Sequence, residues 1–316
     1  MGKAKILISG GAGYVGGYLT DLLLENGYGV TVYDNLMYES RYLKKAPFIY
    51  GDVRELEKLA GIINNFDIII WLAALVGDEA CAVNPTITKE INLASVQWIV
   101  DNYKGKLIFA SSCSVYGINN HLIDESAETN PLSLYASTKV EAEKMIASRL
   151  KNYLILRFGT LFGIGDDHSR LRFDLVVNYL TMKAAKGEPL SVFGGGQWRP
   201  LIHVKDVAEA IFFAIQKDIQ GLYNLSDKNY KMCDVAEEIK RVLKDLKVKV
   251  EYTNLKFEDL RNYRVASEKF KAYGWKPKYS LEHGIREIHQ KIQEARIKDL
   301  NDPVYSNAAF IKSKFI

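Results

Sequence analysis

Apolar residues in the first half of the chain occur as short continuous runs, separated by longer segments with helical spacing. Continuous rather than alternating apolar runs are typical of parallel strands that are buried on both faces. The runs predict strands near 3–9, 30–34, 48–50, 68–72, 107–111 and 154–158, and the intervening segments predict helices near 14–26, 54–63, 86–103 and 133–150. This alternation predicts an α/β fold built on a doubly wound parallel sheet.

A glycine-rich turn follows the first predicted strand, with glycines at 10, 13 and 16. Gly10 permits a tight turn, Gly13 lets a pyrophosphate approach the backbone, and Gly16 lets the next helix pack closely on the strand. The start of that helix, with Tyr14 and Val15 in the turn, offers free N–H groups to the phosphates. The spacing therefore predicts a dinucleotide site at the start of a Rossmann domain.

An acidic residue further along supports the same interpretation. Asp34 ends the second predicted strand, close to the distance from the glycines at which a carboxylate binds the ribose of a dinucleotide. The glycines alone would also fit an ordinary strand–helix turn, so the prediction depends on both features. Asn35 and Leu36 follow Asp34, and no arginine stands there to bind a 2′-phosphate. We therefore expect NAD rather than NADP as cofactor.

The pattern changes in the second half of the chain. A loop-like stretch leads to an amphipathic helix near 171–186, and the last helical pattern lies near 281–298. We expect residues 1–165 to form the NAD-binding domain and residues 166–316 to form a smaller C-terminal substrate-binding domain. A segment near 201–224 is expected to return to the sheet of the first domain.

Composition disfavours several classes of function. The 42 Lys and Arg are spread along the 316 residues and balance 38 Asp and Glu, so no nucleic-acid partner is implied. No run of 18 apolar residues occurs, so we expect no membrane partner. Cys81, Cys113 and Cys233 form no Cys-x-x-Cys pair and no zinc pattern. The sequence therefore predicts a reduced, cytoplasmic protein without a metal site.

A second group of polar residues follows the fifth predicted strand. Ser112 lies where that strand ends, and Tyr135 and Lys139 are four apart, on one face of the helix near 133–150. A lysine beside a phenol favours the phenolate and lowers the phenol pKa from about 10. The phenolate would take a proton from an alcohol while a hydride leaves to nicotinamide, with Ser112 holding the alcohol oxygen.

The spacing of Tyr135 and Lys139 alone is weak support, because Tyr-x-x-x-Lys is a common surface pairing. Its place after a dinucleotide motif and a serine-rich strand end favours the catalytic interpretation. Together the motifs resemble the extended short-chain dehydrogenase/reductase family that acts on nucleotide sugars. The resemblance covers nearly the whole chain through the glycine turn, residues 34–36, 51–53 and 72–74, Asn92, Ser112, Tyr135, Lys139 and 199–206.

The resemblance implies a set of cofactor contacts. It places Asp34 and Asn35 at the adenosine ribose, Asp52 and Val53 at the adenine, Leu72, Ala73 and Ala74 along the cofactor, Asn92 in support of Lys139, and Lys139 at the nicotinamide ribose. Simpler interpretations remain for some of them. Asp52 also suits the cap of a helix starting at Arg54, and Leu72 suits plain core. Asn92 lies on an apolar helix face, where a buried amide needs partners.

The resemblance also implies substrate contacts. Arg199 lies in the stretch whose arginine grips the nucleotide diphosphate, a task that suits the bidentate guanidinium. Arg261 and Arg264 lie where a second phosphate-binding arginine often occurs. Thr160 stands where many relatives have a substrate-contacting Asn. The substrate implied is a nucleotide sugar.

Four further polar residues lie near these positions. Arg170 and Arg172 suit either the substrate or a solvated helix start. His203 and Asp206 are expected to be structural, with Asp206 capping the helix that follows. In this family the helices near 86–103 and 133–150 commonly pair across a dimer, so a homodimer is expected.

The predicted activity is that of an NAD-dependent nucleotide-sugar epimerase, similar to UDP-glucose 4-epimerase, which oxidises a sugar transiently to a keto sugar. A 4,6-dehydratase, a keto-sugar reductase and a non-catalytic dinucleotide sensor are the alternatives. Trp71 stands where the family usually has a histidine, and Pro200 replaces a frequent Asp. These departures leave the identity of the sugar undetermined. Cys113 and Ser114 stand where dehydratases typically carry an acid and a Glu base, which disfavours dehydration.

Overall fold

The computed structural model describes residues 3–168, 170–253, 261–294, 297 and 299–315. Its largest sheet has seven strands, and each neighbouring pair is parallel. In spatial order they are β11 (Gly221–Leu225), β7 (Tyr153–Phe158), β5 (Lys106–Ser112), β4 (Ile68–Trp71), β1 (Lys5–Ser9), β2 (Gly29–Asp34) and β3 (Phe48–Tyr50). The predicted doubly wound parallel sheet is confirmed.

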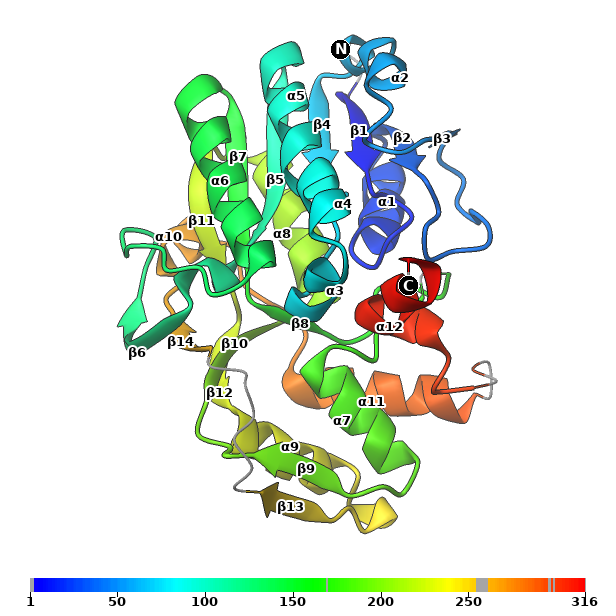
Figure 1. Ribbon diagram of the computed structural model, residues 1–316, viewed down its shortest axis with the longest axis vertical. Coiled ribbons are helices and arrows are strands. Elements are labelled where there is room, and N and C mark those ends of the chain that lie inside the picture. Colours follow the sequence, from blue (N-terminus) through cyan, green and yellow to red (C-terminus); the bar gives the residue numbers. More distant parts are fainter. Residues whose placement is uncertain (1–2, 169, 254–260, 295–296, 298, 316) are drawn as a thin grey trace.

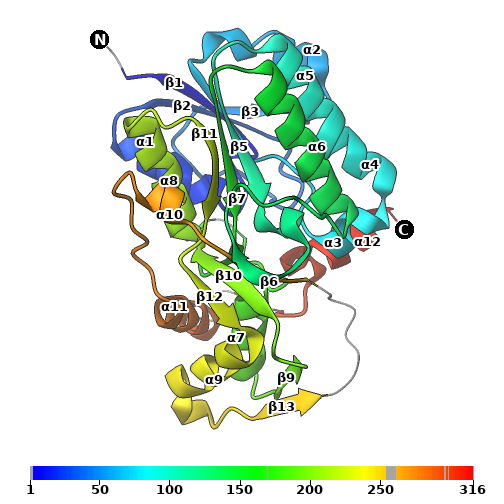
Figure 2. The same cartoon turned by 90° about the vertical axis from the view of Figure 1, so that its left-hand side faces the viewer.

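Helices cover both faces of this sheet (Figure 2). One face carries α1 (Gly16–Glu25) and α8 (Val204–Gln216), and the other carries α2 (Leu56–Ala60), α4 (Pro85–Lys89), α5 (Ser95–Asn102) and α6 (Leu134–Arg149). Side chains of β1 alternate between the two layers, because Ile6 and Ile8 join the core under α1 and α8 whereas Leu7 joins the core under α5 and α6. Burial on both sides explains the continuous apolar runs of the strands.

The long helix expected near 86–103 is broken into three parts. α4 begins with Pro85 at its first position and is capped by Asn84, whose side-chain oxygen accepts the Ile87 N–H at 3.1 Å. A five-residue π-helix, Glu90–Ala94, follows before α5 begins at Ser95. Such wide turns inside helices are frequent at functional sites. Here the π-helix contains the buried Asn92.

A second lobe lies below the sheet in Figure 1. It contains three small sheets, formed by β8 (Thr160–Phe162), β10 (Trp198–His203) and β12 (Lys228–Lys231), by β9 (Leu190–Phe193) and β13 (Val250–Thr253), and by β6 (Ile118–Ile123) and β14 (Asn262–Val265). The helices α7 (Val176–Ala185), α9 (Met232–Val242) and α11 (Leu281–Gln293) complete its own apolar core. β8 precedes residue 165 but pairs with β10, so the small sheet begins before the expected boundary.

Three short helices complete the fold, α3 (Asp78–Val83), α10 (Glu268–Lys271) and α12 (Asn307–Phe315). The helix expected near 171–186 begins only at Val176, because residues 170–174 are drawn into contacts with the C-terminal segment. The helix expected near 281–298 ends at Gln293, and residues 295, 296 and 298 of that expectation lie outside the described residues.

The cap of α8 differs from the expectation. His203, not Asp206, caps the helix, because its Nδ1 accepts the Lys205 N–H at 3.1 Å. Asp206 lies inside the first turn, and its carboxylate accepts the backbone N–H groups of Lys278 and Tyr279 at 2.7 and 3.1 Å. Asp206 is structural, as expected, but it holds a neighbouring loop instead of its own helix.

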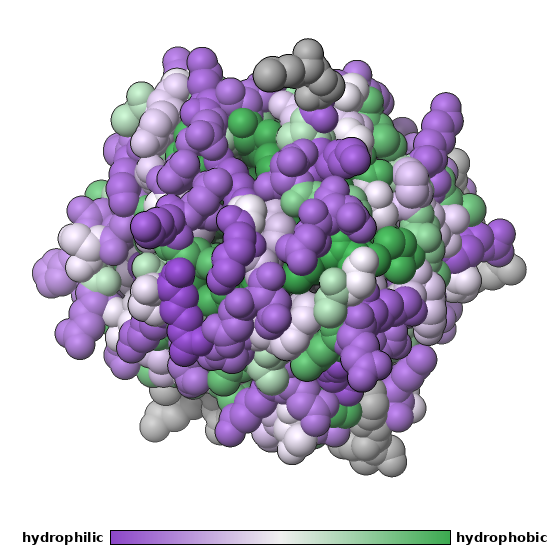
Figure 3. Space-filling model, turned by 90° about the horizontal axis from the view of Figure 1, so that it is seen from above, coloured by the Kyte–Doolittle hydropathy of each residue, from purple (hydrophilic) through white to green (hydrophobic). Residues whose placement is uncertain are grey.

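The outer surface is mainly polar. Viewed from above, hydrophilic side chains cover most of the molecule, and hydrophobic side chains show only in patches between them (Figure 3). Among the described residues, no helix combines the length and apolar character needed to cross a membrane.

Candidate active site

One cavity of 1320 Å³ collects the predicted site residues where the strand ends of the large sheet face the second lobe. The candidates named for the cofactor, the chemistry and the substrate line it, except Asn92 and Arg264. Arg264 instead donates to the carbonyl of Asn120 at 3.0 Å and lies over the Trp198 ring. Pockets for a single small ligand usually measure about 300–1,000 Å³. This cavity therefore has room for a dinucleotide and a second ligand together.

The glycine-rich turn is packed so closely that side chains would not fit. Gly10 has φ +79°, and a Cβ there would lie 2.6 Å from the backbone nitrogen of Ala73. A Cβ on Gly16 would lie 2.6 Å from the Cα of Gly11. The turn therefore brings strand end, loop and helix start together at the cavity wall. No side chain caps α1, so its first N–H groups suit a phosphate.

Asp34 ends β2 and lines the cavity. Its two oxygens accept the backbone N–H groups of Leu36 at 2.8 Å and of Ala12 at 3.0 Å, which fixes the carboxylate between the turn and the next loop. Burial raises the pKa of Asp34, and these two hydrogen bonds oppose that rise. A fixed acceptor at this place fits ribose hydroxyl groups, as the sequence predicts.

Asp52 also lines the cavity and is held by hydrogen bonds from two residues. Asn35 Nδ2 donates to Asp52 Oδ2 at 2.9 Å, and Arg54 donates to Oδ1 from its backbone N–H and from Nε, each at 2.9 Å. Burial raises the pKa of Asp52, but the bonds from Arg54 and Asn35 outweigh it and hold the pKa below its usual range. The helix begins only at Leu56, so Asp52 braces the turn before it. Its contact with adenine stays a prediction.

Ser112, Tyr135 and Lys139 meet at the carboxyl end of β5. Ser112 ends that strand, whereas Tyr135 and Lys139 lie on one face of α6, whose cap is Ser133. Ser112 Oγ accepts the hydroxyl of Ser114 at 2.9 Å, and Ser112 lies close enough to the Tyr135 phenol to lower its pKa. The serine hydroxyl therefore lies beside the phenol, where an alcohol oxygen would have to bind.

The electrostatics of the pair differ from the expectation. Burial raises the pKa of the Tyr135 phenol above its usual value, although the bond to Ser112 and the charge of Arg172 lower it. Burial also lowers the pKa of Lys139 to about 8. The Lys139 ammonium donates to the carbonyl oxygen of Ala110 at 2.7 Å and does not offset the burial of the phenol. Burial therefore opposes the lowering of the Tyr135 pKa that is expected from Lys139, and that lowering stays a prediction.

Asn92 lies behind the cavity wall. Its Oδ1 accepts the Leu75 N–H at 2.8 Å and its Nδ2 donates to the Leu75 carbonyl at 2.9 Å, so both ends of the amide are used. Nδ2 also lies 3.5 Å from Oγ1 of Thr138, the residue before Lys139. Asn92 thus fixes the loop after β4. Its support of Lys139 itself stays a prediction.

Two arginines form a cationic wall at the other end of the cavity. Arg199 lies on β10 and donates to the backbone carbonyls of Trp198, at 2.9 Å, and Arg261. The Arg261 guanidinium pairs with Asp78 at 2.9 Å, and Asp78 also accepts the Ser133 hydroxyl at 2.6 Å. Both arginines, with Thr160 at the start of β8, line the cavity. Their binding of a diphosphate stays a prediction.

Arg170 and Arg172 also line the cavity, and the solvated helix start weighed for them is wrong. Only 7% of Arg172 is exposed, and its guanidinium donates to both oxygens of Asp174 at 3.0 and 2.9 Å. Its charged carbon lies 5.9 Å from the ring centre of Tyr14 in the glycine-rich turn. The second lobe therefore brings a buried cation opposite the turn.

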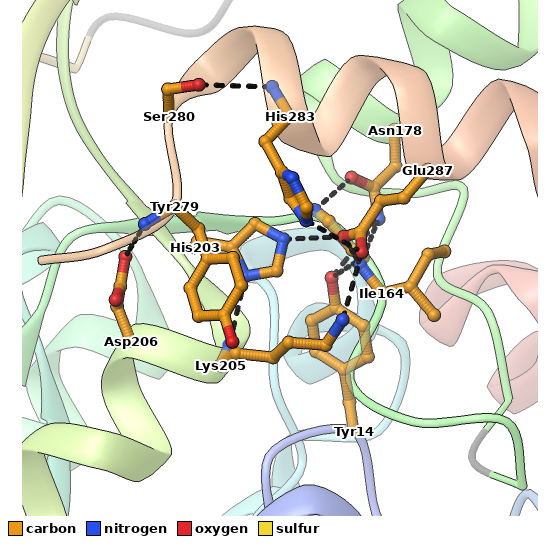
Figure 4. A network of polar contacts seen from close by, with 11 residues as sticks. Tyr14, Ile164, Asn178, His203, Lys205, Asp206, Tyr279, Ser280, His283 and Glu287 are labelled. Carbon is orange, nitrogen blue, oxygen red and sulfur yellow. Dashed lines mark hydrogen bonds and ion pairs between the residues drawn. The ribbon is translucent and has the colours of Figure 1, made fainter.

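The side chain of Tyr14 joins the two lobes. Its hydroxyl donates to the carbonyl of Gly163 and accepts from Asn178 at 3.3 Å (Figure 4). The next residue, Ile164, donates its N–H to Glu287 of α11 at 2.5 Å. These contacts thus connect α11, through residues 163 and 164, to the glycine-rich turn. The Tyr14 hydroxyl is engaged there, so its contribution to the cavity comes from its ring and backbone.

His203, His283 and Glu287 lie close enough to suggest a metal site, with their ligand atoms within 4.8 Å of one another. The hydrogen bonds argue for a structural cluster instead. His203 Nδ1 accepts the Lys205 N–H, so Nε2 carries the proton and donates to Glu287 at 2.5 Å (Figure 4). The Lys205 ammonium lies 3.0 Å from the other Glu287 oxygen, where it would repel a metal ion.

Sequence reasoning missed a buried network beneath the catalytic residues. Glu143 accepts three hydrogen bonds from the Arg157 guanidinium, at 2.6–3.2 Å, and one from Ser111 at 2.5 Å. Glu143 lies one helical turn beyond Lys139 on the same face of α6. That spacing was a usable signal. Asn307, which also contacts the cavity wall, gave no local signal because its partners are more than 100 residues away.

Known proteins share both the sequence and the fold. The sequence profile of the NAD dependent epimerase/dehydratase family matches residues 6–226. A UDP-glucose 4-epimerase of Halalkalibacterium halodurans is 31% identical over 312 residues, which cover 88% of this chain and 92% of that protein.

Solved structures agree with this match. The Thermus thermophilus UDP-glucose 4-epimerase in complex with NAD is similar with a TM-score of 0.78 at 26% identity, covering 92% of this chain and 99% of that one. The Thermotoga maritima UDP-glucose 4-epimerase with UDP-glucose gives a TM-score of 0.80 at 25% identity, with the same coverage. The chain therefore belongs to the NAD dependent epimerase/dehydratase family and is an enzyme that uses NAD.

Proposed function

We propose that this enzyme is a nucleotide-sugar epimerase that inverts a hydroxyl-bearing carbon of a UDP-hexose. One observation carries the proposal. Ser112, Tyr135 and Lys139 line the same cavity as the glycine-rich turn and the two arginines 199 and 261. Relatives at 25–31% identity are UDP-glucose 4-epimerases, and one of them was solved with UDP-glucose. UDP-glucose is therefore the first substrate to test.

The residues present fit NAD. Gly10, Gly13 and Gly16 form the close turn, Asp34 offers a fixed acceptor, and Arg172 adds a cation opposite the turn. When bound, NAD supplies the hydride acceptor and donor that oxidation and re-reduction of a sugar carbon require. The other steps belong to side chains of this chain.

Proton transfer is assigned to Tyr135. Its phenol oxygen takes the proton of the sugar hydroxyl during oxidation and returns it during reduction, while Ser112 holds the same oxygen by a hydrogen bond. Because burial raises the phenol pKa, the phenolate needs additional positive charge nearby. Lys139 would supply part of it, and the positively charged nicotinamide ring of oxidised NAD would supply the rest when bound.

Dehydration fits the cavity less well. Cys113 is fully buried and donates to the carbonyl of Arg157 at 3.2 Å, and burial raises its thiol pKa. Ser114 faces the cavity but donates its hydroxyl to Ser112. Asp78, a cavity carboxylate near Tyr135, is paired with Arg261. Cys113 and Ser114 are therefore unsuited to act as the acid and the base that elimination of water needs, and the Asp78 carboxylate is engaged by Arg261.

Substrate panels test the proposal. Purified protein is incubated with UDP-, dTDP- and GDP-hexoses without added cofactor, and the products are analysed by NMR and mass spectrometry. We expect a stereoisomer of unchanged mass from a UDP-hexose, and none with Tyr135→Phe. A 4-keto-6-deoxy product would identify a dehydratase. Turnover only after reduced NAD is added would identify a reductase, and no turnover with any sugar would identify a sensor.

We also propose a homodimer in the cytoplasm. A groove of 720 Å³ runs between the 86–97 stretch and α6, and Leu93, Ala94 and Met145 contribute apolar surface to it. The cysteines at 81, 113 and 233 are all free thiols, which suits a reducing compartment. Light scattering after size-exclusion chromatography should give twice the 35.8 kDa of one chain, and a value of one chain would contradict the dimer.

A further inference from the structure

The C-terminal segment lies between the two lobes (Figure 1). We define the C-terminal arm as residues 303–314, which comprise a short turn and most of α12. Pro303, Tyr305 and residues 306–309 line the same cavity as the glycine-rich turn. The arm is therefore a wall of the cofactor cavity.

Asn307 ties this arm to three residues on two other segments. Its backbone N–H donates to Asp174 at 3.0 Å, its Nδ2 donates to the carbonyl of Val76 at 2.8 Å, and its Oδ1 accepts the Arg170 guanidinium. The side chain is only 3% exposed. Val76 lies on the loop after β4, and Arg170 and Asp174 belong to the second lobe, so one amide bridges both lobes.

Aromatic and apolar contacts hold the arm to the loop that follows Asp34. The ring centres of Phe310 and Tyr38 lie 4.9 Å apart, and the Arg170 guanidinium lies 3.9 Å from the Tyr38 ring centre. Ile311 is fully buried in the core of the large sheet. The loop that carries the expected ribose ligand is thus packed under the arm.

The arm also fixes the buried cation opposite the glycine-rich turn. Asp174 accepts the Asn307 N–H and both donors of Arg172, so the backbone of the arm orients the carboxylate that orients the guanidinium. Arg172 in turn lies beside Tyr14. Asn307→Ala keeps this backbone bond to Asp174 but removes the side-chain bonds to Val76 and Arg170, so it would loosen the arm from the loop after β4 and from Arg170 over Tyr38.

We propose that the C-terminal arm retains the dinucleotide in the cavity, with Asn307 as the positioning residue that locks the arm to both lobes. A cofactor held between the Asp34 loop, the glycine-rich turn and Arg172 leaves only when these walls part, and Asn307 joins the segments that must part. Retention suits a reaction that oxidises and then reduces one substrate. The inference concerns NAD alone, so it stands or fails independently of the sugar.

The rate of NAD release tests this proposal. Protein loaded with NADH is mixed with excess NAD, and the decay of nicotinamide fluorescence gives the dissociation rate. We expect Asn307→Ala to release NADH about tenfold faster than the unchanged protein, which corresponds to ~1.4 kcal/mol. Asn307→Asp should release it at a rate between those of the unchanged protein and Asn307→Ala, because the aspartate keeps an acceptor for Arg170. Lys312→Ala is the matched control on the same helix, since its pair with Glu79 is exposed.

Equal release rates for Asn307→Ala and Lys312→Ala would overturn the proposal. Thermal unfolding of the cofactor-free variants shows whether the fold is intact. If Asn307→Ala does not fold, Arg170→Met replaces it, because this change removes the same bond to Asn307 from the opposite side and keeps the apolar stem over Tyr38. Unchanged release in Arg170→Met would then overturn the proposal.

Discussion

Glu143→Gln should destabilise the fold more than a typical change of one side-chain atom. The Glu143 and Arg157 side chains are 5% and 6% exposed, and their closest atoms lie 2.6 Å apart. Glutamine keeps the shape but removes the negative charge, and its amide N–H groups would face the N–H groups of Arg157. Removing one partner of a buried pair typically costs about 3–5 kcal/mol, because the other charge stays buried without compensation.

The hydrogen bonds of the carboxylate place this change within that range. The carboxylate accepts three bonds from Arg157 and a fourth from Ser111, so both of its oxygens are used inside the protein. We expect a loss of roughly 3–5 kcal/mol in the free energy of unfolding. Urea titration followed by circular dichroism measures it. The matched control is Asp101→Asn, which removes an exposed ion pair with Arg149, a residue of α6 like Glu143. This change should cost at most about 1 kcal/mol.

A second change separates charge loss from lost packing. Adding Arg157→Met to Glu143→Gln removes the stranded cation, so the double variant should lose less stability than the sum of the two single variants. A loss below about 1 kcal/mol for Glu143→Gln, no larger than that of the exposed control, would refute the reasoning that this pair holds α6 against β5 and β7.

Three further outcomes are expected. Asp34→Ala should narrow the preference for NAD over NADP, because a carboxylate there repels a 2′-phosphate; equal binding of both by the unchanged protein in calorimetry would contradict this. Tyr135→Phe should lower the turnover rate by about 10²–10⁴ with NAD binding intact, and near-normal turnover would place the chemistry elsewhere. Burial lowers the pKa of Lys139 to about 8. The unfolded chain therefore holds more protons between pH 8 and 10.5, stability from this group should rise with pH there, and Lys139→Met should abolish that rise in urea titrations at each pH.

Local patterns predicted the large sheet well. Strands buried on both faces leave continuous apolar runs, and the glycines at 10 and 16 are required by close backbone contacts that only their spacing reveals. The same logic found Ser112, Tyr135 and Lys139, because a strand end and a four-residue helical spacing are local features.

Features set by distant contacts were beyond such patterns. The stretch at 170–174 reads as a helix start, but contacts with Asn307, more than 130 residues later, hold it outside the helix. The position of Asp206 suggests a helix cap, but its carboxylate accepts the backbone N–H groups of residues 278 and 279 instead. Burial, not the neighbouring Lys139, governs the pKa of Tyr135, and burial depends on the whole fold.

Transfer of an isotope label tests the central proposal most directly. UDP-glucose carrying deuterium at C4 is incubated with the protein in ordinary water, without added cofactor, and the product is analysed by NMR and mass spectrometry. A reversible oxidation in which Tyr135 handles only the hydroxyl proton predicts UDP-galactose of unchanged mass with deuterium kept at C4. Loss of the label to water, or a product lighter by one water molecule, would contradict the account.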